Sequence, residues 1–242
     1  LIFHGCIPVD PAGNFLPLPD PNLSNTLTGK AMFEHINTII LRALEERRAH
    51  DLDFLWYLWS GPCSPLFGKD RIATLERDFI ADKKPHEEHK DPYFTLINDA
   101  DFCDKVLREF AVDPARGLIV NGHVPVKIEK GESPLKRSGK AITIDGAFSE
   151  AYGDHGYTLV LEADRTLLAL HHHFESVDAA VKIGINIVPQ VTLIRESHPP
   201  RRMSDTERGH ELRARIVLLE HLVEAYRRNR LPQTTPPPPE RY

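Results

Sequence analysis

Two copies of one pattern, an apolar strand that runs directly into a histidine and a glycine, constrain the fold of this chain most strongly. The chain opens with Leu1-Ile2-Phe3 followed by His4-Gly5, and a second strand from Leu118 runs into Asn121-Gly122-His123. A strand end holds a side chain still, and neutral imidazole ligates Mn, Fe, Zn and Ni alike. We therefore expect His4 and His123 to bind metal. Two ordinary polar residues at strand ends are the alternative, because short motifs also arise by chance.

A basic segment follows the second histidine and precedes a strand that ends at Asp145-Gly146. Its basic residues are Lys127, Lys130, Lys136, Arg137 and Lys140. Lysine is a common point-charge partner of phosphate. We therefore predict that Lys127, Lys136 and Lys140 bind phosphate groups of an anionic substrate. A solvated hairpin loop is the alternative, and composition alone favours it.

A run of three histidines, His171-His172-His173, is a second metal candidate. Only His171 and His173 share a face if the run continues a strand. A His-rich tract is a compositional hint, so a half-exposed strand edge remains the simpler interpretation.

Composition excludes several classes of function. The 242 residues carry 30 Lys and Arg against 35 Asp and Glu, a net charge of -5, and no long basic stripe, so nucleic acid is not the expected partner. No apolar run approaches the ~20 residues of a membrane span. Three scattered cysteines without a CxxC pair fit a reducing cytoplasm.

Periodicity predicts a mixed α/β chain. The final helix, 205–228, is capped by Ser204 or Asp205 and carries an apolar stripe. The aromatic run Phe54–Trp59 holds both tryptophans and is expected in the core. Helices are predicted over 29–49, 70–80, 101–111 and 177–183, and strands over 118–121, 141–145, 157–162, 167–173 and 187–195. The apolar stripe comprises Leu212, Ile216, Leu219, Val223 and Tyr226, and helix 29–49 is expected to bury Phe33, Ile36, Ile40 and Leu44.

The first residue, Leu1, already lies in an expected strand beside a functional histidine. We therefore expect residues 1–231 to be the C-terminal portion of a domain that begins further upstream. A trimmed or incompletely read sequence is the alternative. Residues 232–242, PQTTPPPPERY, are expected to form a disordered proline-rich tail.

Several motifs closely resemble the class III fructose-1,6-bisphosphatases of bacteria, and more loosely the wider calcineurin-like phosphoesterases. They are HGCIPVD at His4–Asp10, FLWYLWSGPCSPLFGK at Phe54–Lys69, NGHVPVKIEKGESPLKRSGKAITIDGAFSEAY at Asn121–Tyr152, GYTLVL at Gly156–Leu161 and SDTERGHELRARIVLLEHLVEAYR at Ser204–Arg227. The resemblance implies a four-layer α/β sandwich with a two-metal centre, often manganese, that activates a hydroxide to attack phosphorus. His4 and His123 match two of the family's metal-binding histidines.

The chain also departs from the family pattern, because it contains no GDxxDR and no GNH motif. The resemblance therefore places the remaining ligands and the catalytic residues upstream of Leu1. It implies hydrolysis of the 1-phosphate of fructose 1,6-bisphosphate in gluconeogenesis, with a homo-oligomer possible. A phosphoprotein phosphatase-like enzyme, or a catalytically inactive fragment that acts as a binding or oligomerisation module, are the alternatives.

Overall fold

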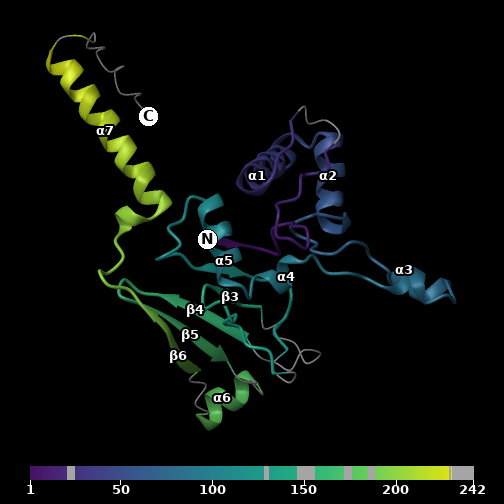
Figure 1. Cartoon of the computed structure of the whole chain (residues 1–242). Coiled ribbons are helices and arrows are strands. Elements are labelled where there is room, and N and C mark those ends of the chain that lie inside the picture. Colours follow the sequence, from purple (N-terminus) through teal and green to yellow (C-terminus); the bar gives the residue numbers. More distant parts are fainter. Residues whose placement is uncertain are drawn as a thin grey trace, which may run out of the picture. The chain divides into compact units, whose positions relative to one another are not determined.

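The computed structural model describes residues 1–20, 25–127, 131–145, 156–171, 176–184, 189–228 and 230 (Figure 1). The chain divides into two compact units. The first comprises Leu1–Leu159 and Leu168–Val191, and the second comprises Val160–Leu167 and Thr192–Tyr242. Helices and strands both occur in the chain, with a run of helices between the first two strands and four consecutive strands after it. This confirms the predicted mixed class, of the α+β kind.

A three-stranded parallel sheet forms the centre of the first unit. It comprises β1 (Ile2–Phe3), β2 (Ile119–Asn121) and β3 (Ala141–Thr143), in the order β1-β2-β3. Ile2 pairs with Val120, and Asn121 pairs with Thr143. Because all three strands run in the same direction, their carboxyl ends lie at one edge of the sheet.

Two helices beside this sheet supply much of its hydrophobic core: α4 (Tyr93–Leu96) and α5 (Ala100–Glu109) (Figure 1). The Asp99 carboxylate accepts the Phe102 N–H at 2.8 Å and caps α5. The sequence places Phe102, Val106, Leu107 and Phe110 on one face of this helix; the first three are buried and Phe110 is half-buried against the core.

A helical hairpin, α1 (Gly29–Glu46) and α2 (Ala49–Ser60), holds a second hydrophobic cluster. Arg42 makes a bidentate pair with buried Asp51, at 2.7 Å from Nε and 2.5 Å from Nη2, which joins the two helices. Of the predicted face of α1, Ile36 is buried and Phe33 and Ile40 are half-buried against the core, but Leu44 is 70% exposed. The helix also buries Met32, Ile39 and Ala43, which the prediction left out.

The aromatic run in α2 corrects a prediction. Phe54 and Leu58 are buried, but Trp56 and Trp59 are 67% and 61% exposed. In a helix, residues three and four apart lie on the same face. Only part of a continuous apolar run can therefore face the core. The remaining helical turns of this unit are α3 (Thr74–Phe79), η1 (Lys84–His86) and α6 (Val177–Ile183).

A second sheet has the strand order β4-β5-β6, and the boundary between the two units passes through it. Its strands are β4 (Gly156–Leu161), β5 (Arg165–His171) and β6 (Gln190–Glu196). They correspond to three predicted strands, with ends displaced by one to three residues.

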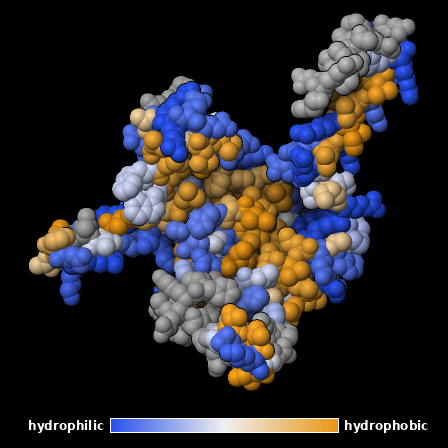
Figure 2. All heavy atoms as spheres, turned by 180° about the vertical axis from the view of Figure 1, so that it is seen from behind, coloured by the Kyte–Doolittle hydropathy of each residue, from blue (hydrophilic) through white to orange (hydrophobic). Residues whose placement is uncertain are grey.

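The second unit contains η4 (Met203–Asp205) and the long helix α7 (Glu207–Arg227). The predicted cap was wrong: the Thr206 hydroxyl accepts the Gly209 N–H at 3.0 Å, whereas Asp205 accepts the Arg202 N–H at 2.9 Å in the preceding turn. Apolar side chains run along α7 in Figure 2. The predicted stripe residues are 40–58% exposed.

Among the described residues, no helix combines the length and the apolar character that crossing a bilayer requires. The predicted tail, 232–242, lies outside the described residues, and the assignment of 1–231 to one domain stays a prediction.

Candidate functional site

The edge where the three parallel strands end gathers the residues that the two strand patterns singled out. His4 follows β1 and His123 follows β2, and their ring atoms Nε2 and Nδ1 lie 3.0 Å apart. Asp145 follows β3, and Gly122 lies between these elements: a Cβ there would be 3.8 Å from His4 Nδ1 and 4.0 Å from Asp145 Cβ. The fold therefore joins two histidines separated by 119 positions.

A buried amide holds the strand ends together. Asn121 is 2% exposed. Its Nδ2 donates to the Gly5 carbonyl at 3.0 Å, and its Oδ1 accepts from the Thr143 hydroxyl at 3.0 Å. One side chain on β2 thus binds the segment after β1 and the end of β3, which fixes the backbone beneath both histidines.

Gly5 is required where the chain leaves β1. Its φ is +82°, and a Cβ there would lie 2.0 Å from the Pro65 carbonyl oxygen. That oxygen accepts the N–H of buried Cys6 at 2.9 Å. Only a residue without a side chain permits this approach, so the glycine determines the direction in which His4 leaves the sheet.

The protonation of His123 follows from its contacts. Its Nε2 lies 3.1 Å from the Phe67 carbonyl oxygen. A carbonyl can only accept, so Nε2 carries the hydrogen and Nδ1 of the neutral ring presents its lone pair toward His4. Burial lowers the pKa of His123, and His4 and Lys69 add to this effect, against the Phe67 hydrogen bond and the charge of Asp145.

These features fit a metal ligand. Metal-binding histidines usually donate the second ring N–H to a carbonyl or carboxylate, which fixes the tautomer, as Phe67 does here. Two nitrogens that share one ion at about 2.1 Å also lie about 3 Å apart in an octahedral shell. Within the described residues, however, no group of three or more His, Cys, Asp or Glu side chains could hold a metal. The described part of the chain therefore offers two donors, His4 and His123.

The histidines open onto an apolar cleft of about 560 Å³, which we call the histidine cleft. Its charged lining residue, Lys69, is paired with Glu88 at 2.8 Å. Exposed Trp59 lines it too. The remaining lining residues are Ile40, Leu55, Leu58, Leu66, Phe67 and Ile72.

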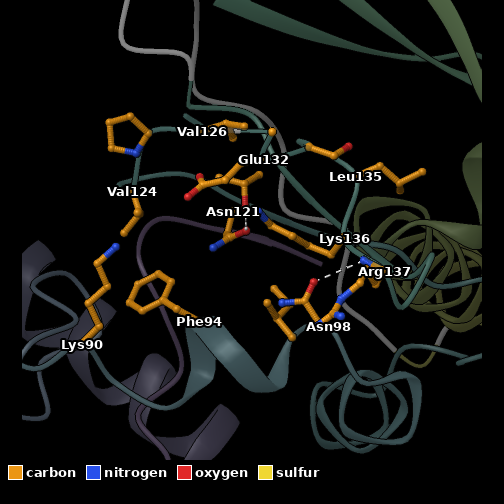
Figure 3. Close-up of a pocket in the computed structure, with 15 residues that line it drawn as sticks. Lys90, Phe94, Asn98, Asn121, Val124, Val126, Glu132, Leu135, Lys136 and Arg137 are labelled. Atoms are coloured by element: carbon orange, nitrogen blue, oxygen red, sulfur yellow. Dashed lines mark hydrogen bonds between the residues drawn. The ribbon is translucent and has the colours of Figure 1, made fainter. Parts of the chain in front are cut away.

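The three candidate lysines do not lie together in one cavity. Lys136 lines a cavity of about 380 Å³, which we call the lysine cavity (Figure 3). Lys127 is exposed and is not part of its lining. The Lys140 ammonium forms an ion pair with Asp104 and donates to the Pro114 carbonyl at 3.4 Å.

The histidine run is only partly described. His171 Nε2 lies 2.8 Å from the Thr158 hydroxyl oxygen on the neighbouring strand. His172 and His173 lie outside the described residues, as does Lys130. Asp145 and Phe67 were missed by the sequence reasoning. The position of Asp145 directly after a strand was a usable signal, whereas a backbone carbonyl contact leaves no signal in the sequence.

Comparison with known proteins identifies the family. The family model described as Firmicute fructose-1,6-bisphosphatase matches residues 1–228. Proteins named fructose-1,6-bisphosphatase class 3 are similar over 94% of this chain: 41% identical in Fusobacterium nucleatum, and 38% identical in both Clostridium acetobutylicum and Alkaliphilus metalliredigens. The alignments cover 36%, 35% and 36% of those relatives, so the chain spans about a third of their length. No solved structure matches the chain. The match over nearly all of the chain shows that it belongs to the Firmicute fructose-1,6-bisphosphatase family.

Proposed function

We propose that the protein carrying this chain hydrolyses fructose 1,6-bisphosphate to fructose 6-phosphate and phosphate, in the cytoplasm and in gluconeogenesis. In this proposal the chain is part of a calcineurin-like four-layer sandwich whose other strands lie upstream of Leu1. The names of the similar proteins support the substrate. The observation that carries the chemistry is the His4–His123 pair at the edge of the parallel sheet.

His4 and His123 would hold the metal. The Phe67 carbonyl keeps hydrogen on Nε2 of His123 and leaves Nδ1 as a donor atom. When bound, a dinuclear divalent centre, with Mn²⁺ as the proposed metal, would supply an activated hydroxide and neutralise charge on the phosphoryl group. Asn121 and Gly5 keep the two rings in register by fixing the strand ends.

The lysine-rich segment is proposed to hold phosphate groups of the substrate. Its geometry favours Lys136, which lines a cavity, over Lys127, which does not. Lys140 is a weaker candidate, because its ammonium already pairs with Asp104. An arriving phosphate would have to compete with that carboxylate.

The test is a phosphate-release assay of the full-length protein with Mn²⁺ and fructose 1,6-bisphosphate. We expect His123→Ala to lower kcat/KM by at least about 100-fold, because metal supplies both nucleophile and charge stabilisation. His171→Ala is the matched control and should change kcat/KM by less than about twofold, since His171 contacts Thr158.

Two outcomes would replace this proposal. Turnover of phosphopeptides with indifference to sugar bisphosphates would identify a phosphoprotein phosphatase-like enzyme. An absence of phosphate release from either class of substrate would favour the inactive binding or oligomerisation module.

A further inference from the structure

The lysine cavity is separate from the histidine cleft. Its floor includes Asn121 and Thr143, at the ends of β2 and β3, but neither His4 nor His123 lines it. The other lining residues come from three segments: 90–98, which includes α4, 124–126 after β2, and the loop 131–137. Its volume of about 380 Å³ falls within the range of about 300–1,000 Å³ that is typical of small-molecule sites.

The charges of this cavity are unbalanced. Among the described residues that line it, three are cationic, Lys90, Lys136 and Arg137, and one, Glu132, is a carboxylate. In Figure 3 the Lys136 ammonium reaches toward Asn121 from one side, and Lys90 stands on the opposite side. In the part of the chain that the structure describes, no carboxylate forms an ion pair with Lys136. An anion between the two lysines would therefore balance their positive charges.

The local electrostatics support this interpretation. Burial lowers the pKa of Lys136, Glu132 opposes the effect, and the positive charge of Lys90 adds to it. The two ammonium groups are thus close enough to repel each other. Like charges directed into one cavity destabilise the empty protein, and such arrangements are typical of binding sites.

The remaining lining explains what else a ligand would contact. The Asn98 carbonyl oxygen Oδ1 accepts the backbone N–H of Arg137 at 3.3 Å, which fixes the base of that residue (Figure 3). The Ser133 side chain adds a hydroxyl. Phe94, Val126 and Leu135 provide an apolar wall. A few polar groups converging beside an apolar wall suit a small organic anion better than a bare inorganic ion.

We propose that the lysine cavity binds the phosphoryl group of a small phosphorylated metabolite, held between Lys136 and Lys90 with Arg137 beside them. Two sources share this chemistry. One source is the sugar bisphosphate, whose non-hydrolysed phosphate would occupy the cavity; this alternative rests on the proposed function. The other source is a separate phosphorylated effector, and this alternative does not rest on the proposed function.

Binding is measured by calorimetry on the full-length protein in EDTA, with inorganic phosphate and fructose 1,6-bisphosphate as probes. Metal-free buffer prevents turnover and removes any contribution of the histidine pair. We expect Lys136→Gln and Arg137→Gln each to weaken binding at least tenfold. Lys30→Gln is the matched control, because it removes one positive charge from an exposed helical site, where Lys30 pairs with Glu34, and Lys30 does not line the cavity. It should leave affinity within twofold.

Competition between the probes separates the two sources. If phosphate and the bisphosphate compete, and Lys136→Gln weakens both and raises KM, the cavity holds the substrate's second phosphate. If phosphate and the bisphosphate bind at the same time, and Lys136→Gln abolishes binding of phosphate but not of the bisphosphate, the cavity is an effector site. Affinities within twofold of wild type for Lys136→Gln, Arg137→Gln and Lys90→Gln overturn the proposal. If the protein binds phosphate in this cavity but does not hydrolyse fructose 1,6-bisphosphate, the proposed function is wrong and the proposed site stands.

Discussion

The sharpest test of how the histidines are positioned is Gly5→Ala compared with Gly139→Ala. Both glycines have positive φ, +82° and +67°, so both alanines carry a backbone strain of about 1–2 kcal/mol. They differ in their surroundings. A Cβ at Gly5 would lie 2.0 Å from the Pro65 carbonyl oxygen, whereas nothing lies within 4 Å of a Cβ at Gly139.

The additional cost at Gly5 can be worked out from the contact. The Pro65 carbonyl must move, and it accepts the N–H of buried Cys6 at 2.9 Å. A buried N–H left without its partner costs about 1–3 kcal/mol. We therefore expect Gly5→Ala to lower the free energy of unfolding by roughly 2–5 kcal/mol, and Gly139→Ala by only about 1–2 kcal/mol.

Urea denaturation of the two variants measures the difference, and phosphate release measures its consequence. Because Gly5 sets the exit of His4 from the sheet, Gly5→Ala should also reduce turnover by the protein that remains folded. Gly139→Ala should retain wild-type turnover. Equal destabilisation by the two substitutions, within about 0.5 kcal/mol, would show that the Pro65 contact adds no cost at Gly5.

Two further predictions concern buried Asn121 and partly buried Asp91. Asn121→Ala should cost about 2–4 kcal/mol of unfolding free energy, because two buried hydrogen bonds lose their shared side chain, and Thr143→Val should add little once Asn121 is gone. A double-mutant cycle measures this coupling, and strictly additive losses would contradict it. Burial raises the pKa of Asp91 from 3.8 to about 6, so the native state holds a proton there that the unfolded state releases. The stabilisation is fully present below about pH 4 and is lost as pH rises through about 6, by roughly 1–2 kcal/mol after allowance for partial exposure. Asp91→Asn should flatten this part of the stability curve, and an unchanged slope in urea titrations between pH 4 and 6.5 would count against the assignment.

Local sequence patterns predicted the helices and strands. They failed where contacts between segments distant in the sequence determine which residues are buried or paired. The spacing of Phe102, Val106 and Leu107 was sufficient to place α5 and its buried face. The density of aromatic residues near Trp56 was misleading. A continuous apolar run does not indicate which of its residues face the core, and a helix buries one face only. The cap of α7 was misplaced since Thr206, Asp205 and Ser204 are all good cap residues, and only the geometry of the preceding turn selects among them.

The candidate site shows the same division. The strand-His-Gly pattern at His4 and His123 marked both residues, but their 3.0 Å contact depends on parallel pairing between β1 and β2 across more than a hundred positions. The lysines were grouped because they are close in sequence. The fold separates them, because Lys140 forms an ion pair with Asp104 of α5, which is distant from it in the sequence.

Backbone strain adds an argument that residue types alone do not supply. His123 has φ of +75°, although the residue before it, Gly122, has no positive φ. Arg47, Cys63 and Ala111 share that conformation. Arg47 and Ala111 follow the ends of α1 and α5, where a left-handed residue closes the helix, and Cys63 lies in a turn. His123 instead follows a strand, and a glycine at that position would relieve the strain. A strained non-glycine residue persists where its side chain is needed, and the side chain here presents Nδ1 to His4. The strain therefore favours a functional role for His123 independently of the family to which the chain belongs.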